Sequence, residues 1–114
     1  MNKIIIANWK MNPPTLKAAE ELFNFYDHSA KENSKNDVII CPPFIYLDAL
    51  SKISSNLKLG AQNCHWEENG PFTGEISPLM LKGMGVNYVI LGHSERRWAI
   101  NENDEMTNIK IKAV

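Results

Sequence analysis

The sequence has no excess of charge of either sign and no long apolar run. Its 114 residues include 12 Lys and Arg against 13 Asp and Glu, which gives a net charge of −1. General nucleic-acid binders and membrane-surface proteins depend on excess positive charge, so this balance argues against both classes. Asn8 and Lys10 break the short apolar run at residues 4–6, so no signal peptide is expected, and no stretch approaches the roughly 20 apolar residues that cross a bilayer. We therefore expect no nucleic-acid or membrane partner.

Cysteines and cofactor-binding motifs are also scarce. The only two cysteines, Cys41 and Cys64, provide neither a disulfide framework nor a zinc-ligand spacing, and we interpret them as buried thiols in a reducing compartment such as the cytoplasm. His28 and His65 are interpreted as structural residues, and Cys64-His65 with His93 lacks a recognisable ligand spacing, so no metal site is predicted. No Gly-x-Gly-x-x-Gly or Walker-type loop occurs, which argues against a nucleotide-binding fold.

Short apolar runs alternate with segments of helical periodicity. The runs predict strands at residues 4–7, 38–41, 57–61 and 88–91. The first has the continuous pattern of a strand buried on both faces, and Lys58 weakens the third. Polar loops are expected over residues 31–37 and 62–76, and a loop as long as the second is usually functional or disordered.

Helices are expected after each strand. They are predicted to open at residues 13–15, over 46–53, at Ser77-Pro78, over 94–99 and from Asp104 onward. Ser77 suits the cap of the third helix and Pro78 suits its first turn. One face of the first helix is expected to be apolar and to carry Leu16, Ala19, Leu22, Phe23 and Tyr26.

The repeated strand–helix order predicts an α/β fold with about four parallel strands and intervening helices. Right-handed crossovers are expected between the strands. The chain suits one domain, residues 1–114, and is too short for two. Such a unit is either a whole doubly wound domain or half of a barrel, and periodicity alone does not separate these architectures.

Polar residues gather where the apolar strands end. In parallel α/β proteins ligands bind there, because strand carboxyl ends and helix amino ends face the same crevice. The first strand is followed by Asn8, Trp9 and Lys10, the third by Gln62, Asn63, Cys64 and His65, and the fourth by His93, Ser94, Glu95, Arg96 and Arg97.

His93 is the most informative of these residues. It follows Gly92 and precedes Ser94, which can cap a helix, and the amino end of a helix disfavours an imidazolium cation. A neutral imidazole donates one proton and accepts another, so it can move protons between adjacent oxygens. The alternative is a structural histidine that is hydrogen-bonded at the end of a strand.

Lys10 and Glu95 also have two interpretations each. Lys10 could bind a phosphate or stabilise a developing oxyanion, or it could be an ordinary exposed lysine. Glu95 could pair with Lys10 and fix its position, or it could merely complement the dipole of its own helix.

Four segments, in order, resemble signatures of the triosephosphate isomerase family. They are Asn-Trp-Lys-Met-Asn at 8–12, Ala-Gln-Asn-Cys at 61–64, Phe-Thr-Gly-Glu-Ile-Ser at 72–77 and Gly-His-Ser-Glu-Arg-Arg at 92–97. The resemblance covers essentially the whole chain and implies the N-terminal half of a (β/α)₈ barrel. Pro71 and the Pro13-Pro14 pair depart from the family pattern, and neither touches a catalytic position.

The resemblance implies roles for the residues at the strand ends. The family interconverts dihydroxyacetone phosphate and glyceraldehyde 3-phosphate through an enediolate. His93 would polarise the carbonyl and move protons between the two oxygens, Lys10 would supply positive charge, and Asn8 would be its hydrogen-bonding neighbour. Ser94 and Glu95 would not touch the substrate but would support the residues that do. No metal or organic cofactor is implied.

The resemblance also implies a homodimer and an incomplete active site. The segment Phe72, Thr73, Gly74 and Glu75 would reach a second subunit and brace its Asn8-to-Lys10 motif. A barrel takes about 250 residues, and the family's general base, lid and phosphate-binding loops follow later strands. We expect this partial sequence to be inactive alone; the alternative is a non-catalytic half-barrel module for binding or assembly.

Overall fold

The sheet is parallel, and its strands follow one another in chain order. The computed structural model describes residues 3–32 and 35–114. Its four strands, in the order β1-β2-β3-β4, are β1 (Ile4–Asn8), β2 (Asp37–Cys41), β3 (Lys58–Ala61) and β4 (Tyr88–Val89). All three pairings are parallel, with Asn8 opposite Cys41 and Ala61 opposite Val89. The carboxyl ends of the strands therefore meet at one edge of the sheet.

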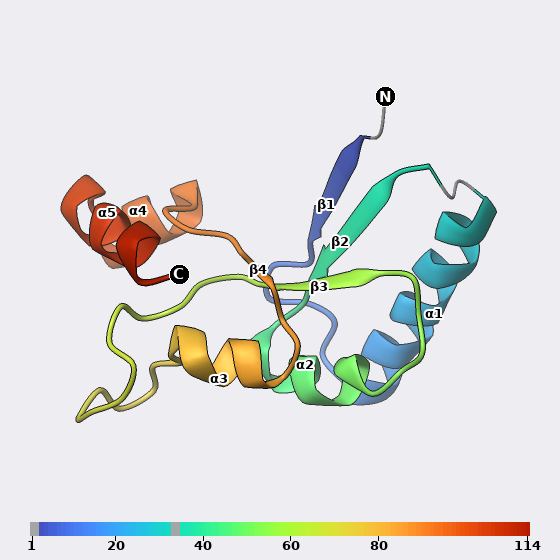
Figure 1. Ribbon diagram of the computed structural model, residues 1–114, viewed down its shortest axis with the longest axis horizontal. Coiled ribbons are helices and arrows are strands. Elements are labelled where there is room, and N and C mark those ends of the chain that lie inside the picture. Colours follow the sequence, from blue (N-terminus) through green and yellow to red (C-terminus); the bar gives the residue numbers. More distant parts are fainter. Residues whose placement is uncertain (1–2, 33–34) are drawn as a thin grey trace.

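Of the described helices, the first three connect the strands and lie to one side of the sheet, and the last two follow the fourth strand. They are α1 (Leu16–Glu32), α2 (Phe44–Ser51), α3 (Pro78–Gly83), α4 (Ser94–Ile100) and α5 (Asp104–Ala113). In Figure 1 α1, α2 and α3 follow the outside of the curled sheet, while α4 and α5 lie beyond β4. Four curled parallel strands with helices between them form half of a barrel, so the predicted fold class is confirmed.

The core lies between the sheet and its helices, in two clusters. One joins Trp9 and Ile40 to Phe23 of α1 and Leu50 of α2. The other joins Leu47, Ala61, Cys64, Leu81 and Val86. Ser77 caps α3 by accepting the N–H of Met80, as predicted. The buried face of α1 includes Ala19 and Phe23, whereas Leu16, at the first turn, is 44% exposed, contrary to the prediction.

The first strand is not buried on both faces, which corrects the prediction. Ile4, Ile5 and Ile6 are 66%, 47% and 57% exposed. Within the described part of the chain β1 pairs with β2 alone, so it is an edge strand with neighbours on one side. An open half-barrel leaves such an edge uncovered.

Smaller differences concern element ends. The fourth strand covers only two of the four predicted residues, although the N–H of Ile90 still bonds to the carbonyl of Ala61 at 2.8 Å. The first helix continues to Glu32, past the start of the predicted loop over 31–37, and residues 33 and 34 of that loop lie outside the described residues. In the part of the chain that is described, no helix is long and apolar enough to cross a membrane.

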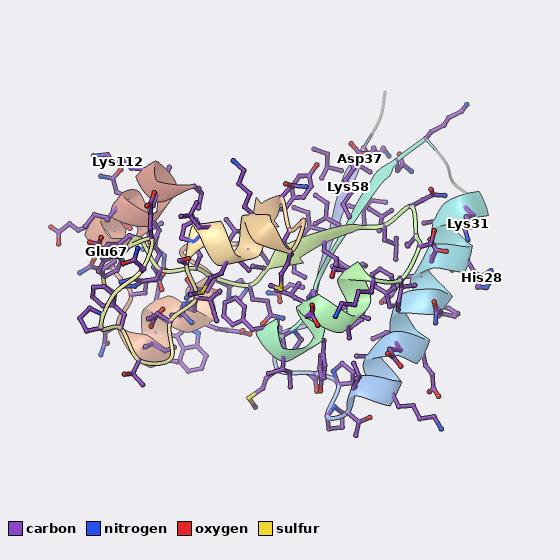
Figure 2. The ribbon with its side chains drawn as sticks, turned by 60° about the horizontal axis from the view of Figure 1, so that its bottom comes forward. His28, Lys31, Asp37, Lys58, Glu67 and Lys112 are labelled. Atoms are coloured by element: carbon purple, nitrogen blue, oxygen red, sulfur yellow. The ribbon has the colours of Figure 1, made fainter. Side chains whose placement is uncertain are left out.

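Lys58, which weakened the prediction of the third strand, belongs to that strand. Its Nζ lies 2.8 Å from Asp37 Oδ1 on β2 and 5.8 Å from the centre of the Tyr88 ring on β4. Figure 2 labels Asp37 and Lys58 where these neighbouring strands begin. Hydrogen bonds to Asp37 and Tyr88 raise the pKa of Lys58. The sheet tolerates the charge of Lys58 because its partners lie on both neighbouring strands.

Candidate active site

A cleft opens where the carboxyl ends of the strands meet. Its volume is about 270 Å³, and Asn8, Lys10, Gln62, Asn63, His93 and Glu95 are among its lining residues. These residues end β1 or follow β1, β3 and β4, so the parallel register brings together segments that are far apart in sequence. Most of the strand-end residues that the sequence predicted to share a crevice do share one, whereas Ser94 and Arg97 after β4, and Trp9, Cys64 and His65 after β1 and β3, are not among its lining residues.

Hydrogen bonds restrain the backbone of Lys10, and an ion pair restrains the end of its side chain. Its backbone is left-handed, with φ of 56°. Its amide N–H donates to Asn8 Oδ1 at 2.9 Å, and its carbonyl accepts from Gln62 Nε2 at 2.8 Å. At the far end of the side chain, Nζ lies 2.6 Å from Glu95 Oε1.

The ion pair between Lys10 and Glu95 joins the loop after β1 to helix α4. The predicted pairing is therefore present. A hydrogen bond from Lys10 lowers the pKa of Glu95, and the positive charge of Lys10 acts in the same direction. Both side chains are about half exposed, at 55% and 41%, so the pair adds little to folding stability and mainly restricts where the ammonium group can go.

His93 caps helix α4 with its ring. Its Nδ1 accepts the backbone N–H of Glu95 at 3.1 Å. An accepting nitrogen carries no proton, so the neutral ring has its proton on Nε2. The expectation that Ser94 caps this helix is wrong, because His93 already occupies the cap position; Ser94 is the first helical residue and is exposed.

A buried ionic cluster underlies the turn that carries His93. Glu102 is 3% and Lys110 is 2% exposed. Glu102 Oε2 accepts from Arg96 Nε and from Lys110 Nζ, both at 2.8 Å, while its Oε1 accepts from the N–H of Gly92 at 3.2 Å. Burial raises the pKa of Glu102, but the hydrogen bonds and charges of Lys110 and Arg96 outweigh burial and lower it. The Glu102 carboxylate is thus ionised, and it fixes the turn through its hydrogen bond from the Gly92 N–H.

Gly92 cannot carry a side chain in this turn. Its φ is +63°, a region that glycine adopts at no steric cost, and a Cβ there would lie 2.8 Å from Thr107 Cγ2 of α5. The turn therefore packs directly on α5. Arg97 Nε donates to the Gly92 carbonyl at 2.8 Å and closes the turn from the α4 side.

The sequence did not assign roles to Gln62, Glu102 or Lys110. Gln62 contacts backbone carbonyls, and a backbone partner leaves no side-chain pattern in the sequence. Glu102 and Lys110 are eight residues apart, a spacing that predicts no contact within one helix. Their one sequence signal is a pair of opposite charges on either side of the start of α5.

The segment Phe72, Thr73, Gly74 and Glu75 lies away from the cleft. It belongs to the long connection between β3 and α3, which projects from the sheet in Figure 1. Thr73 is exposed, and the N–H of Glu75 bonds to the Phe72 carbonyl at 3.0 Å. The Phe72 ring packs on the buried ring of His65, with centres 4.4 Å apart. In the described residues, the tip of this connection at Thr73 is thus exposed, while the Phe72 ring anchors the connection to His65.

The remaining histidine and cysteines lie outside the cleft. His28 is exposed on α1 (Figure 2). Cys41 and Cys64 are free and buried, as predicted for the thiols. Among residues 3–32 and 35–114, no group of three or more His, Cys, Asp or Glu side chains is placed to hold a metal ion.

Comparison with known proteins identifies the family. The family model described as triosephosphate isomerase matches residues 3–114. The triosephosphate isomerase of Trichodesmium erythraeum (strain IMS101) is 51% identical over 116 residues, covering 99% of this chain and 48% of the relative. That of Clostridium botulinum (strain Eklund 17B / Type B) is 50% identical over 119 residues, covering 99% and 46%.

A third relative gives the same picture. The triosephosphate isomerase of Alkaliphilus oremlandii (strain OhILAs) is 51% identical over 115 residues, covering 98% of this chain and 46% of the relative. The chain spans about half the length of the curated relatives it matches. With the half-barrel and the cleft at its strand ends, these matches show that the chain belongs to the triosephosphate isomerase family.

Proposed function

We propose that this chain forms the first half of a triosephosphate isomerase, which interconverts dihydroxyacetone phosphate and glyceraldehyde 3-phosphate in glycolysis and gluconeogenesis. The observation that carries the proposal is the convergence of the Lys10–Glu95 ion pair and the capped His93 ring on one cleft. The names of the relatives support the same reaction. A cytoplasmic location is part of the proposal.

With Nδ1 accepting from the Glu95 N–H, a neutral His93 would have the proton arrangement that this reaction needs. A carboxylate base, which the family carries after its sixth strand, would take a proton from the carbon beside the carbonyl. As the electron pair moves to the carbonyl oxygen, Nε2 of His93 would give its proton to that oxygen and accept the proton of the neighbouring hydroxyl. The ring then ends as it began, and the base returns its proton to the other carbon. The substrate exchanges only protons with the protein and gains or loses no electrons, so no metal or organic cofactor is required.

Lys10 would supply the positive charge in this mechanism. A cation held beside the cleft attracts the phosphate dianion and stabilises the negative oxygen of the enediolate, and a preorganised charge does so without reorganisation. Asn8 would keep the Lys10 backbone in place, and Glu95 its ammonium group. Ser94 would support His93 as the first residue of α4.

We also infer that the active form is a homodimer. The exposed tip that Phe72, Thr73, Gly74 and Glu75 form would reach a second subunit and brace its loop after β1. The exposed side chain of Thr73 and the left-handed turn at Gly74 support an outward-reaching role.

The proposal is tested with a chimera that continues residues 1–114 with the remaining C-terminal half of the Trichodesmium relative. We expect this chimera to be a dimer in light scattering and to isomerise glyceraldehyde 3-phosphate in a coupled assay. A folded dimeric chimera without isomerase activity would overturn the proposal. The Trichodesmium protein itself, assayed in parallel, is the positive control.

The alternative is a non-catalytic half-barrel that pairs with itself or with another half. The exposed isoleucines of β1 favour association of this kind. The chimera distinguishes the two functions, because an assembly module has no need of a working Lys10 or His93. Full activity in the chimera, abolished by His93→Asn, would exclude the alternative as the function of these residues.

A further inference from the structure

Lys10 adopts a backbone conformation that its own side chain disfavours. Its φ of 56° lies in the left-handed region, which residues other than glycine, asparagine and aspartate seldom occupy. Such a conformation persists only where the surroundings impose it, and it is often found at functional sites. The contacts that hold Lys10 in this conformation therefore bear on where its ammonium group points.

One of these contacts comes from Gln62, which directly follows β3. Its side-chain Nε2 donates to the Lys10 carbonyl at 2.8 Å and to the Cys41 carbonyl at 2.8 Å. Both hydrogens of one amide nitrogen are thus used, and they tie the loop after β1 to the ends of β2 and β3. The amide group can make both bonds only while Lys10 presents its carbonyl toward β3.

Asn8 and Glu95 restrain the same residue at other points. Asn8 Oδ1 accepts the Lys10 N–H, and Glu95 Oε1 lies 2.6 Å from Nζ. The Asn8 bond spans only two residues at the end of β1, and the Glu95 bond acts at the tip of a flexible side chain. Of the three residues, Gln62 is the one that connects the Lys10 backbone to strands other than β1, the strand that directly precedes it.

We propose that Gln62 is a positioning residue for catalysis, which fixes the left-handed backbone of Lys10 so that the ammonium group reaches both Glu95 and the cleft. This inference rests on the proposed isomerase function. Without the two donors of Gln62, the Lys10 backbone relaxes toward negative φ and Nζ swings away from the substrate. Gln62 itself transfers no proton.

The first test replaces Gln62 with methionine in the chimera described above. Gln62→Met keeps the length of the side chain and removes both donors. We expect kcat/KM to fall about 10- to 100-fold, the cost of misplacing a catalytic group by about 1 Å. Asn87→Met is the matched control, because Asn87 also donates from its amide to a backbone carbonyl, that of Gly85, outside the cleft. The control should leave kcat/KM unchanged.

A double-mutant cycle separates positioning from general stabilisation. In a Lys10→Met background the charge is already gone, so Gln62→Met should lower kcat/KM no further. Additive losses would overturn the inference, since they would mean that Gln62 acts independently of Lys10. An active chimera in which Lys10→Met changes nothing would overturn it as well, together with the proposed role of Lys10.

A variant with a titratable group gives a pH signature. In Gln62→Glu the ionised carboxylate faces two carbonyl oxygens and cannot donate, whereas the protonated acid can donate to one of them. The kcat/KM of Gln62→Glu relative to the unmodified chimera should therefore rise as the pH falls. A ratio that stays constant with pH would contradict the inference.

A structural readout keeps the inference separate from the proposed function. If the unmodified chimera folds but is inactive, the proposed function fails, and the crystal structure of Gln62→Met still decides the question of Lys10. We expect φ of Lys10 to become negative there, with the contact to Glu95 lost. A positive φ and an intact ion pair would overturn the inference.

Discussion

At the scale of single residues, His93 combines two tasks that one substitution can separate. Its Nδ1 caps α4, and its Nε2–H is the group proposed to move protons. Asparagine is a good helix cap but a poor proton carrier at neutral pH. We therefore expect His93→Asn in the chimera to lower kcat by about 10²- to 10⁴-fold while thermal melting changes little.

The matched control for this prediction is His28→Asn. His28 is the exposed histidine of α1 and lies outside the cleft (Figure 2). This variant should keep the full kcat. Equal losses in the two variants, or a His93→Asn enzyme with normal turnover, would contradict the role of His93.

Asp27 carries a residue-scale prediction about acid stability. It is 6% exposed, and it accepts from Ser55 Oγ at 2.7 Å and from Asn56 N at 3.1 Å, with Lys31 Nζ at 2.7 Å. Hydrogen bonds from Lys31 and Ser55 lower its pKa to about 2. Because the pKa is lowered on folding, the stabilisation is present above the unfolded value near 4 and is lost as the pH falls toward 2.

We expect Asp27→Asn to reduce the free energy of unfolding at pH 7 by about 2 kcal/mol, the equivalent of the pKa shift. The difference between the variant and the unmodified chimera should shrink as the pH falls from 5 to 2, in urea titrations at each pH. Asp48→Asn is the control, since Asp48 pairs with Lys52 on an exposed helix surface. A pH-independent difference would contradict the assignment.

Residue roles were predictable where a side chain meets another side chain within a recognisable motif. The pairing of Lys10 with Glu95 followed from their strand-end positions and charges. Gln62 lay at the expected place, but its partner is a carbonyl 52 residues away, which no side-chain pattern encodes. The cap by His93 was missed because serine is the commoner cap and stands next to it.

At the scale of elements, a buried lysine of α5 links this helix to the segment that follows β3. Lys110 Nζ donates to Asn63 Oδ1 after β3 and to Glu102 Oε2, both at 2.8 Å. Lys110→Met would leave a buried carboxylate with Arg96 as its remaining charged partner and an amide oxygen without its donor. Breaking a buried pair from one side costs about 3–5 kcal/mol of folding stability.

We expect this loss in the unfolding free energy of the chimera carrying Lys110→Met. Lys112→Met provides the control from the same helix, since Lys112 is exposed (Figure 2). The control should change stability by less than about 0.5 kcal/mol. A Lys110→Met variant as stable as the control would mean that the cluster contributes nothing net.

Element positions were more predictable than element exposure. Every predicted strand and helix has a counterpart, because periodicity depends on local sequence. The burial of β1 was not predictable, because a run of isoleucines looks the same in a central and an edge strand. The difference arises from the pairing partners, which lie elsewhere in the chain.

At the scale of the whole molecule, the strand order settles what periodicity left open. A doubly wound sheet places its first strand in the interior, with helices on both faces. Here β1 stands at the edge and the order follows the chain, as in a barrel. Consecutive order is a property of the three-dimensional path, so the sequence pattern alone could not distinguish the two folds.

The open sheet predicts the behaviour of the 114 residues expressed alone. They present an apolar edge strand and lack the context of the family's base and phosphate loops, so we expect no significant isomerase activity and either self-association or a molten state. A coupled assay and size-exclusion chromatography with thermal melting test this. Turnover near that of the Trichodesmium relative, or a sharp monomer peak with cooperative melting, would contradict it.

The two buried thiols have a practical consequence for following the opening of the fold. Burial raises the pKa of the Cys41 thiol to about 11, and that of Cys64 is raised as well. Only the thiolate attacks labelling reagents, so each cysteine stays unreactive until its surroundings open. Cys41 ends β2 and Cys64 lies in the second core cluster, so the chain carries two native reporters. Their separate alkylation rates would time the opening of each part of the half-barrel, without any introduced probe.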